Sequence, residues 1–90
     1  MILKKAQVKK KISINQYEVI VDQKDMLIMF IPKKFLMNYI KIENGDTVYI
    51  ILDSNSSNEG KLAMKYDFMN HPDLLLQKEE LDKKDTSKPT

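Results

Sequence analysis

The chain has 90 residues, enough for one domain, with 15 lysines, no arginine and no cysteine. The absence of cysteine excludes disulfides and thiolate metal sites, and no apolar run is long enough to predict a membrane-spanning helix. Charge is uneven: residues 1–34 hold eight lysines against three acidic residues, whereas residues 67–90 hold four lysines against six. The basic front predicts contact with a polyanion.

Residues 1–11 are polar and basic, and we expect them to form a basic N-terminal arm. The cluster Lys9, Lys10 and Lys11 is typical either of a solvated chain end or of an arm that follows phosphates. Met1-Ile2-Leu3 is followed at once by lysine, so there is no apolar core of a signal peptide, and a cytoplasmic location is expected.

Residues 12–66 are predicted to form the main domain. Ile12 to Val21 alternates apolar and polar residues, with a possible interruption at Asn15-Gln16, and Met26 to Ile31 is a continuous apolar run. The polar break between them predicts a hairpin in which residues 18–21 pair with residues 27–30 and Lys24 lies at the tip. A strand that is apolar on both faces needs cover on both sides, which a lone hairpin cannot supply.

Pro32 ends this strand, and residues 33–39 show helical spacing. Gly45 in Asn-Gly-Asp predicts a turn before a strand from Thr47 to Leu52. A polar loop and an alternating segment from Lys61 to Tyr66 complete a second predicted hairpin.

Residues 67–90 are predicted to be a C-terminal extension. Pro72 is suited to the first turn of a helix running to about Lys84, with Leu74, Leu75 and Leu81 on one face and a polar tail behind. This helix either folds back on its own domain or binds along a groove of a partner protein.

Catalytic chemistry finds no support in the sequence. His71 is the only histidine, no cysteine nucleophile exists, and the serines lack an identifiable base. The polar loop from Asp53 lacks the glycine and glutamate that a calcium loop requires. We therefore expect neither an enzyme nor a cofactor or metal.

The ordered set of an apolar strand, Ile31-Pro32, a short basic helix, Ile40-Lys41-Ile42, Gly45-Asp46 and a β-branched strand resembles the AbrB/MazE family. The resemblance covers roughly residues 17–66. It implies a mostly β fold with one short helix, built as a swapped-hairpin barrel from an intertwined homodimer. It also implies DNA binding through basic residues around the first hairpin. Here Met29 and Phe30 precede Ile31-Pro32, where that family often has arginine, so we expect phosphate contacts with modest sequence specificity.

Two sets of residues follow from these arguments. The expected DNA-binding residues are Lys9, Lys10, Lys11, Lys24, Lys33 and Lys34. The expected dimer interface comprises Leu27, Ile28, Met29, Phe30, Ile31, Phe35 and Leu36.

Three functions are consistent with the sequence. The first is a homodimeric transcription regulator that binds double-stranded DNA. The second is an antitoxin whose segment 67–90 binds a toxin, and the third is a dimeric structural module that does not bind DNA.

Overall fold

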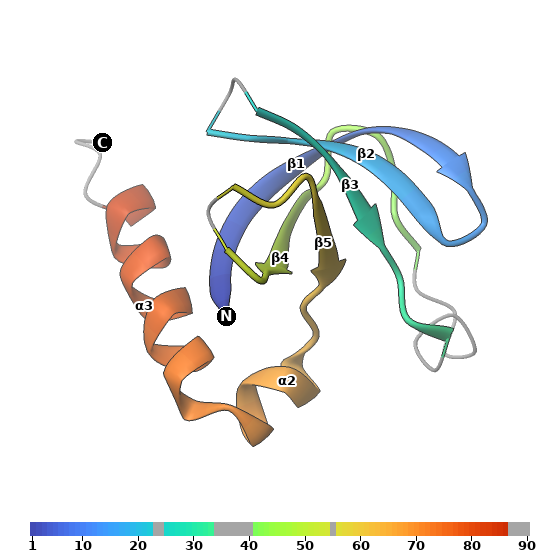
Figure 1. The fold of residues 1–90 in the computed structure, drawn as a ribbon. Coiled ribbons are helices and arrows are strands. Elements are labelled where there is room, and N and C mark those ends of the chain that lie inside the picture. The colour runs from blue at the N-terminus through green and yellow to red at the C-terminus, as the bar shows by residue number, and fades with distance from the viewer. Residues whose placement is uncertain (23–24, 34–40, 55, 87–90) are drawn as a thin grey trace.

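The computed structural model describes residues 1–22, 25–33, 41–54 and 56–86. Within these ranges five strands precede two C-terminal helices (Figure 1). The elements are β1 (Ile2–Ser13), β2 (Gln16–Val21), β3 (Asp25–Phe30), β4 (Thr47–Leu52), β5 (Glu59–Leu62), α2 (Lys65–Asn70) and α3 (Pro72–Thr86). The prediction of a mostly β fold with a C-terminal helix is confirmed.

The strands form a closed barrel in the order β1-β2-β3-β5-β4. Neighbours are antiparallel except β3 and β5, which run parallel over the pairs Ile28↔Glu59, Met29↔Gly60 and Phe30↔Lys61. This order and these directions are those of the five-stranded Greek-key barrel known as the OB-fold. The barrel closes within one chain, and an exchange of hairpins between two chains stays a prediction.

Strand β1 begins at Ile2, so the prediction of a separate arm followed by a strand from Ile12 is wrong. Ala6 and Val8 are buried in the barrel core, while the intervening positions are polar. The alternation of buried and exposed residues in this strand is hard to recognise in the sequence, because the segment has many lysines and Ala6 is small. The predicted interruption is real, because β1 ends at Ser13 and a turn at Ile14-Asn15 leads into β2.

The predicted first hairpin is confirmed. Strands β2 and β3 pair as expected, but the predicted register is wrong by two residues: residues 18–21 pair with residues 25–28, with Glu18 opposite Ile28 and Val19 opposite Leu27. The connecting residues 23–24, and with them the predicted tip at Lys24, lie outside the described residues.

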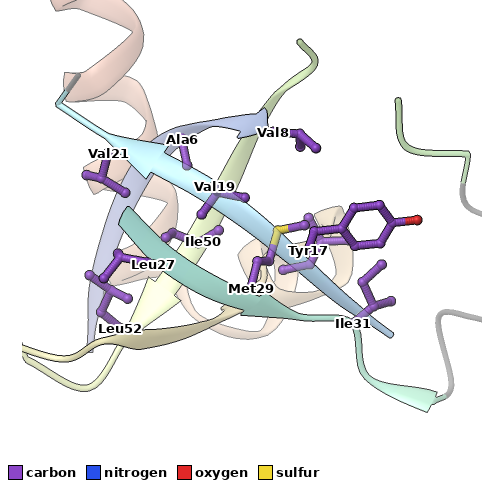
Figure 2. Packing of buried hydrophobic residues seen from close by; sticks show 11 residues of the cluster. Ala6, Val8, Tyr17, Val19, Val21, Leu27, Met29, Ile31, Ile50 and Leu52 are labelled. Atoms are coloured by element: carbon purple, nitrogen blue, oxygen red, sulfur yellow. The ribbon is translucent and has the colours of Figure 1, made fainter. Parts of the chain in front are cut away.

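The barrel core is a single apolar cluster to which each of the five strands contributes (Figure 2). Val19, Met29 and Ile50 have no exposed surface. Of the residues expected at a dimer interface, Leu27, Met29 and Ile31 are buried in this core, and Ile28 and Phe30 are half-buried. Phe35 and Leu36 lie outside the described residues. Cover for the inner face of β3 therefore comes from strands of the same chain.

The predicted second hairpin is confirmed in its pairing but not in its length. Strand β5 pairs with β4 at Ile50↔Leu62 and Ile51↔Lys61, and ends at Leu62. The expected strand to Tyr66 is wrong beyond that point, because the chain turns into α2. The carboxylate of Asp67 accepts a hydrogen bond of 2.8 Å from the Met64 amide, which satisfies a donor at the start of this helix.

Helix α3 begins at Pro72 as predicted and packs against β1. Leu74 is fully buried against Leu3 and Ala63, and Leu81 packs against the same cluster. Leu75 is 41% exposed, so its predicted place on the buried face is wrong. Leu74 and Leu81 lie seven residues apart on one face, whereas Leu75 is rotated away by about 100°.

Candidate nucleic-acid interface

The second half of β1 forms an exposed edge of the barrel. Pairing of β1 with β4 ends at Gln7↔Thr47, and two further bonds join Val8 to the turn before β4: Val8 N–H to Asp46 O (2.8 Å) and Gly45 N–H to Val8 O (2.7 Å). Beyond Val8, β2 is the only strand that pairs with β1 among the described residues. The exposed side chains of Lys9, Lys10 and Lys11 follow at once along this edge.

Two irregularities interrupt the pairing of this edge with β2. The register shifts between Val8 and Lys10 and again between Lys11 and Ser13, which leaves Lys9 and Ile12 as extra residues. Bulges increase local twist and re-aim side chains. Bulges and lysines also keep an edge strand from pairing with another sheet. Lys9–Lys11 can therefore protect this edge as well as bind a ligand.

The turn at Ile14-Asn15 is tied to the end of β3. The Ile31 amide donates a 2.9 Å hydrogen bond to the Asn15 carbonyl oxygen. Lys33 follows Ile31 by two residues and is exposed. The structure therefore brings Lys33 to the same end of the barrel as the β1–β2 turn, which Lys9–Lys11 precede along the chain. We call this end, with Lys9–Lys11, Ile12, Ile14 and Lys33, the basic pole.

Several lysines outside the basic pole have acidic partners. Lys4 approaches Asp22 at 3.9 Å, Lys41 approaches Glu43 at 3.2 Å, and Lys5 approaches Asp82 at 3.5 Å. Among the described residues no ion pair involves Lys9, Lys10, Lys11 or Lys33. Their charge is thus available to an external anion.

The remaining predicted DNA-binding lysines are not described. Lys34 lies outside the described residues, as does Lys24. Asp22 and Asp25, the described residues on either side of the gap at 23–24, lie at the end of β3 opposite Lys33. Along a six-residue strand this separation is about 17 Å. Within one chain, the acidic pair Asp22 and Asp25 and the basic pole are therefore at different ends of the barrel.

The outer face of β2 and β3 next to the basic pole is mixed in character. Glu18 lies opposite both Lys10 and Ile28, and Phe30 lies between Gln16 and Lys61. A stacking surface for single-stranded nucleic acid uses several aromatic side chains. Among the described residues of this face Phe30 is the only aromatic one, so the arrangement is better suited to phosphate contacts than to base stacking.

Sequence reasoning missed a polar cluster that fastens α3 to the barrel. The Tyr49 hydroxyl donates to the Asp82 carboxylate, and Lys78 Nζ lies 2.8 Å from the same carboxylate. Lys5 and Lys78 lie 5.4 and 5.3 Å from the centre of the Tyr49 ring, within range of a cation–π contact. The spacing of Lys78 and Asp82 is a recognisable helical pair, but only the fold shows that Tyr49 joins it.

These contacts shift three pKa values. Hydrogen bonds from Lys78 and Tyr49 lower the pKa of Asp82 from 3.8 to about 2. The pKa of Tyr49 is raised by burial and by its bond to Asp82, and the Asp82 hydrogen bond raises the pKa of Lys78. All three shifts keep the cluster in one protonation state near neutrality. Such a cluster fixes a helix in place.

A groove of about 450 Å³ lies between β5 and the α2–α3 corner. Apolar side chains such as Phe30 and Leu74 line it together with Asp53, Glu59 and His71. Among the described residues, no group of three histidine or acidic side chains is placed to hold a metal ion. The groove is therefore a concave surface in which the described side chains do not form a metal-binding site.

Comparison with known proteins adds no relative: no protein-family model matches the chain, and no curated protein matches it. Over the described residues, none of the helices has both the length and the apolar character needed to cross a membrane. The basic pole is therefore the feature of this chain that bears on its function.

Proposed function

We propose that this chain binds double-stranded DNA through the basic pole. The observation that carries the proposal is a set of exposed lysines at one end of the barrel that form no ion pair among the described residues: Lys9–Lys11 from β1 and Lys33 after β3. Lysine acts as a point charge and lacks the planar fork that arginine offers to base edges. The contacts therefore fall on phosphates, and sequence specificity is modest.

Salt dependence is the direct test. The affinity of the full chain for an end-labelled duplex is measured by fluorescence anisotropy at several salt concentrations. Each lysine that neutralises a phosphate contributes about 0.9 to the slope of log affinity against log salt. Replacing Lys9, Lys10 and Lys11 by glutamine should weaken binding by a similar factor on every sequence and reduce the slope by about 0.9 per lysine.

Lys41→Gln is the matched control, because Lys41 is exposed but already paired with Glu43. It should leave both the affinity and the slope close to those of the wild type. No binding of the wild-type chain to duplex DNA at low salt would overturn the proposal and would favour a structural module.

Regulation of transcription by a homodimer follows from the resemblance to the AbrB/MazE family, and is part of the proposal. An intertwined dimer would repeat the basic pole by two-fold symmetry and double its phosphate contacts. Sedimentation of the sample used for DNA binding tests this part separately, since a monomer that binds DNA would leave the interface proposal standing without the dimer.

An antitoxin is the second candidate, and one observation favours it. Although α3 packs against β1 through Leu74, Met69 and Leu76 are 76% and 63% exposed on the α2–α3 segment. Exposed apolar side chains on an acidic segment suit a partner with a hydrophobic groove. A neighbouring toxin gene, and loss of co-purification of its product on Leu76→Asp, would support this role. Co-purification unchanged by that substitution and by Met69→Asp would exclude it.

A further inference from the structure

The tip of the basic pole carries two exposed isoleucines. Ile12 is 47% exposed and Ile14 is 73% exposed. Single exposed aliphatic residues are ordinary on protein surfaces, but here Ile14 begins the β1–β2 turn and Ile12 lies two residues before it, directly after three lysines. Phosphate binding alone gives no use to these isoleucines.

The turn that presents them is held from two sides. The Asn15 carbonyl oxygen accepts the hydrogen bond from Ile31, which fastens the turn to β3. The Ser13 hydroxyl donates to Asn15 Oδ1 at 3.1 Å and lies 3.2 Å from Gln16 Oε1. A turn fixed in this way loses little conformational entropy when it meets a ligand.

Lysines from two segments lie near the apolar tip. Lys9–Lys11 precede it on β1, and Lys33 is two residues beyond Ile31, whose amide bonds the turn at Asn15. The minor groove of a duplex has a row of phosphates along each side and base-pair edges at its floor. Lysines beside an apolar tip could bind those phosphates while the tip contacts the base pairs. Apolar side chains that enter this groove can press between base steps, unstack them and bend the duplex.

We propose that Ile14, supported by Ile12, enters the minor groove and wedges against a base step while the lysines bind the flanking phosphates. The inference rests on the proposed function and adds a mode of binding to it. An aliphatic wedge reads no hydrogen-bonding pattern, so the preference it creates is for deformable pyrimidine–purine steps. Bound DNA is bent.

The test compares Ile14→Ala with Leu76→Ala, a matched control that truncates a similarly exposed aliphatic residue on α3. Affinity is measured by anisotropy, and bending by energy transfer between dyes at the two ends of a duplex with a central TA step. Ile14→Ala should weaken binding roughly tenfold and abolish the bend. It should leave the salt slope unchanged, because no charge is removed. Leu76→Ala should behave as the wild type.

The outcomes separate this inference from the proposed function. If Ile14→Ala binds and bends the duplex like the wild type while the triple lysine variant loses affinity, the wedge is wrong and DNA binding stands. If the wild-type chain binds no duplex, both fall. Binding to vesicles of phosphatidylserine and phosphatidylcholine is measured as well. If the chain binds these vesicles but no duplex, and Ile14→Ala weakens the vesicle binding, the tip is a membrane contact and the wedge is wrong.

Discussion

Strand β1 carries lysines along its whole length, yet its two halves have different surroundings. In the first half, Lys4 and Lys5 approach Asp22 and Asp82, and Leu3 is covered by α3. In the second half, Lys9–Lys11 are exposed beside an unpaired edge. The same residue type thus serves attachment of a helix in one place and remains available to an external anion in the other. Neighbours, more than charge, decide the role of a lysine.

This contrast predicts that the two regions separate experimentally. Substitutions under α3 should lower stability and leave the basic pole able to bind DNA. Substitutions at the basic pole should do the reverse.

The largest effect is expected from Leu74→Ala, because Leu74 has no exposed surface and lies between α3 and β1. Loss of a fully buried leucine should lower the free energy of unfolding by about 2–5 kcal/mol. Urea denaturation followed by circular dichroism measures it. The matched control is Leu76→Ala in the same helix, which should change stability by less than about 0.5 kcal/mol. Equal effects of the two substitutions would show that α3 does not pack through Leu74.

A smaller loss is expected from Tyr49→Phe, which removes the hydroxyl that donates to Asp82. Hydrogen bonds to charged groups are stabilising, but solvent screens the partly exposed Asp82 carboxylate, so the loss should be smaller than that of Leu74→Ala. A double-mutant cycle with Asp82→Asn isolates the interaction. Strictly additive effects would contradict the contact.

Acid should weaken the attachment of α3 further. The pKa of Asp82 is about 2 in the folded chain against an ordinary 3.8, so its stabilising contribution is present above about pH 4 and is lost as the pH falls toward 2. Water screens this partly exposed carboxylate, which keeps the effect below that of Tyr49→Phe. Melting temperatures of the wild type and Asp82→Asn should converge across that window. A constant difference down to about pH 2 would contradict the lowered pKa.

The smallest change in stability is expected from replacing Lys9, Lys10 and Lys11 together by glutamine. These side chains are exposed and unpaired among the described residues, so the free energy of unfolding should stay within about 0.5 kcal/mol while DNA binding falls. Urea denaturation and sedimentation check it. Aggregation of the variant with unchanged DNA affinity would instead assign the lysines to protection of the β1 edge.

The sequence predicted the elements whose patterns are local. The alternation of Tyr17, Val19 and Val21 and the apolar run of β3 predicted the first hairpin, although its register is shifted by two residues because β3 begins at Asp25. Pro72 gave the start of α3. Strand β1 was missed because lysines occupy both exposed and half-buried positions around the small Ala6.

Other features depend on residues far apart in the chain. The parallel pairing of β3 with β5 closes the barrel, and no local sequence pattern around Met29 or Gly60 predicts this pairing. An added Cβ at Gly60 would lie 2.7 Å from Leu52 Cδ2, a close approach that appears only in the folded chain. Likewise the sequence marked Lys9–Lys11 and Lys33 as separate clusters, and only the Asn15–Ile31 bond brings them to one pole.

The Leu3 amide donates to Gln77, a residue 74 positions further along the chain. On a ribosome, the first strand therefore leaves the exit tunnel long before β4, which completes its ladder, or α3, which covers it. The β1–β2–β3 meander can form early. Until β4 and α3 are synthesised, the edge of β1 that pairs with β4 is open and the face of β1 that α3 covers is exposed to solvent. Lysines on that strand would then keep the nascent chain soluble, before any ligand is met.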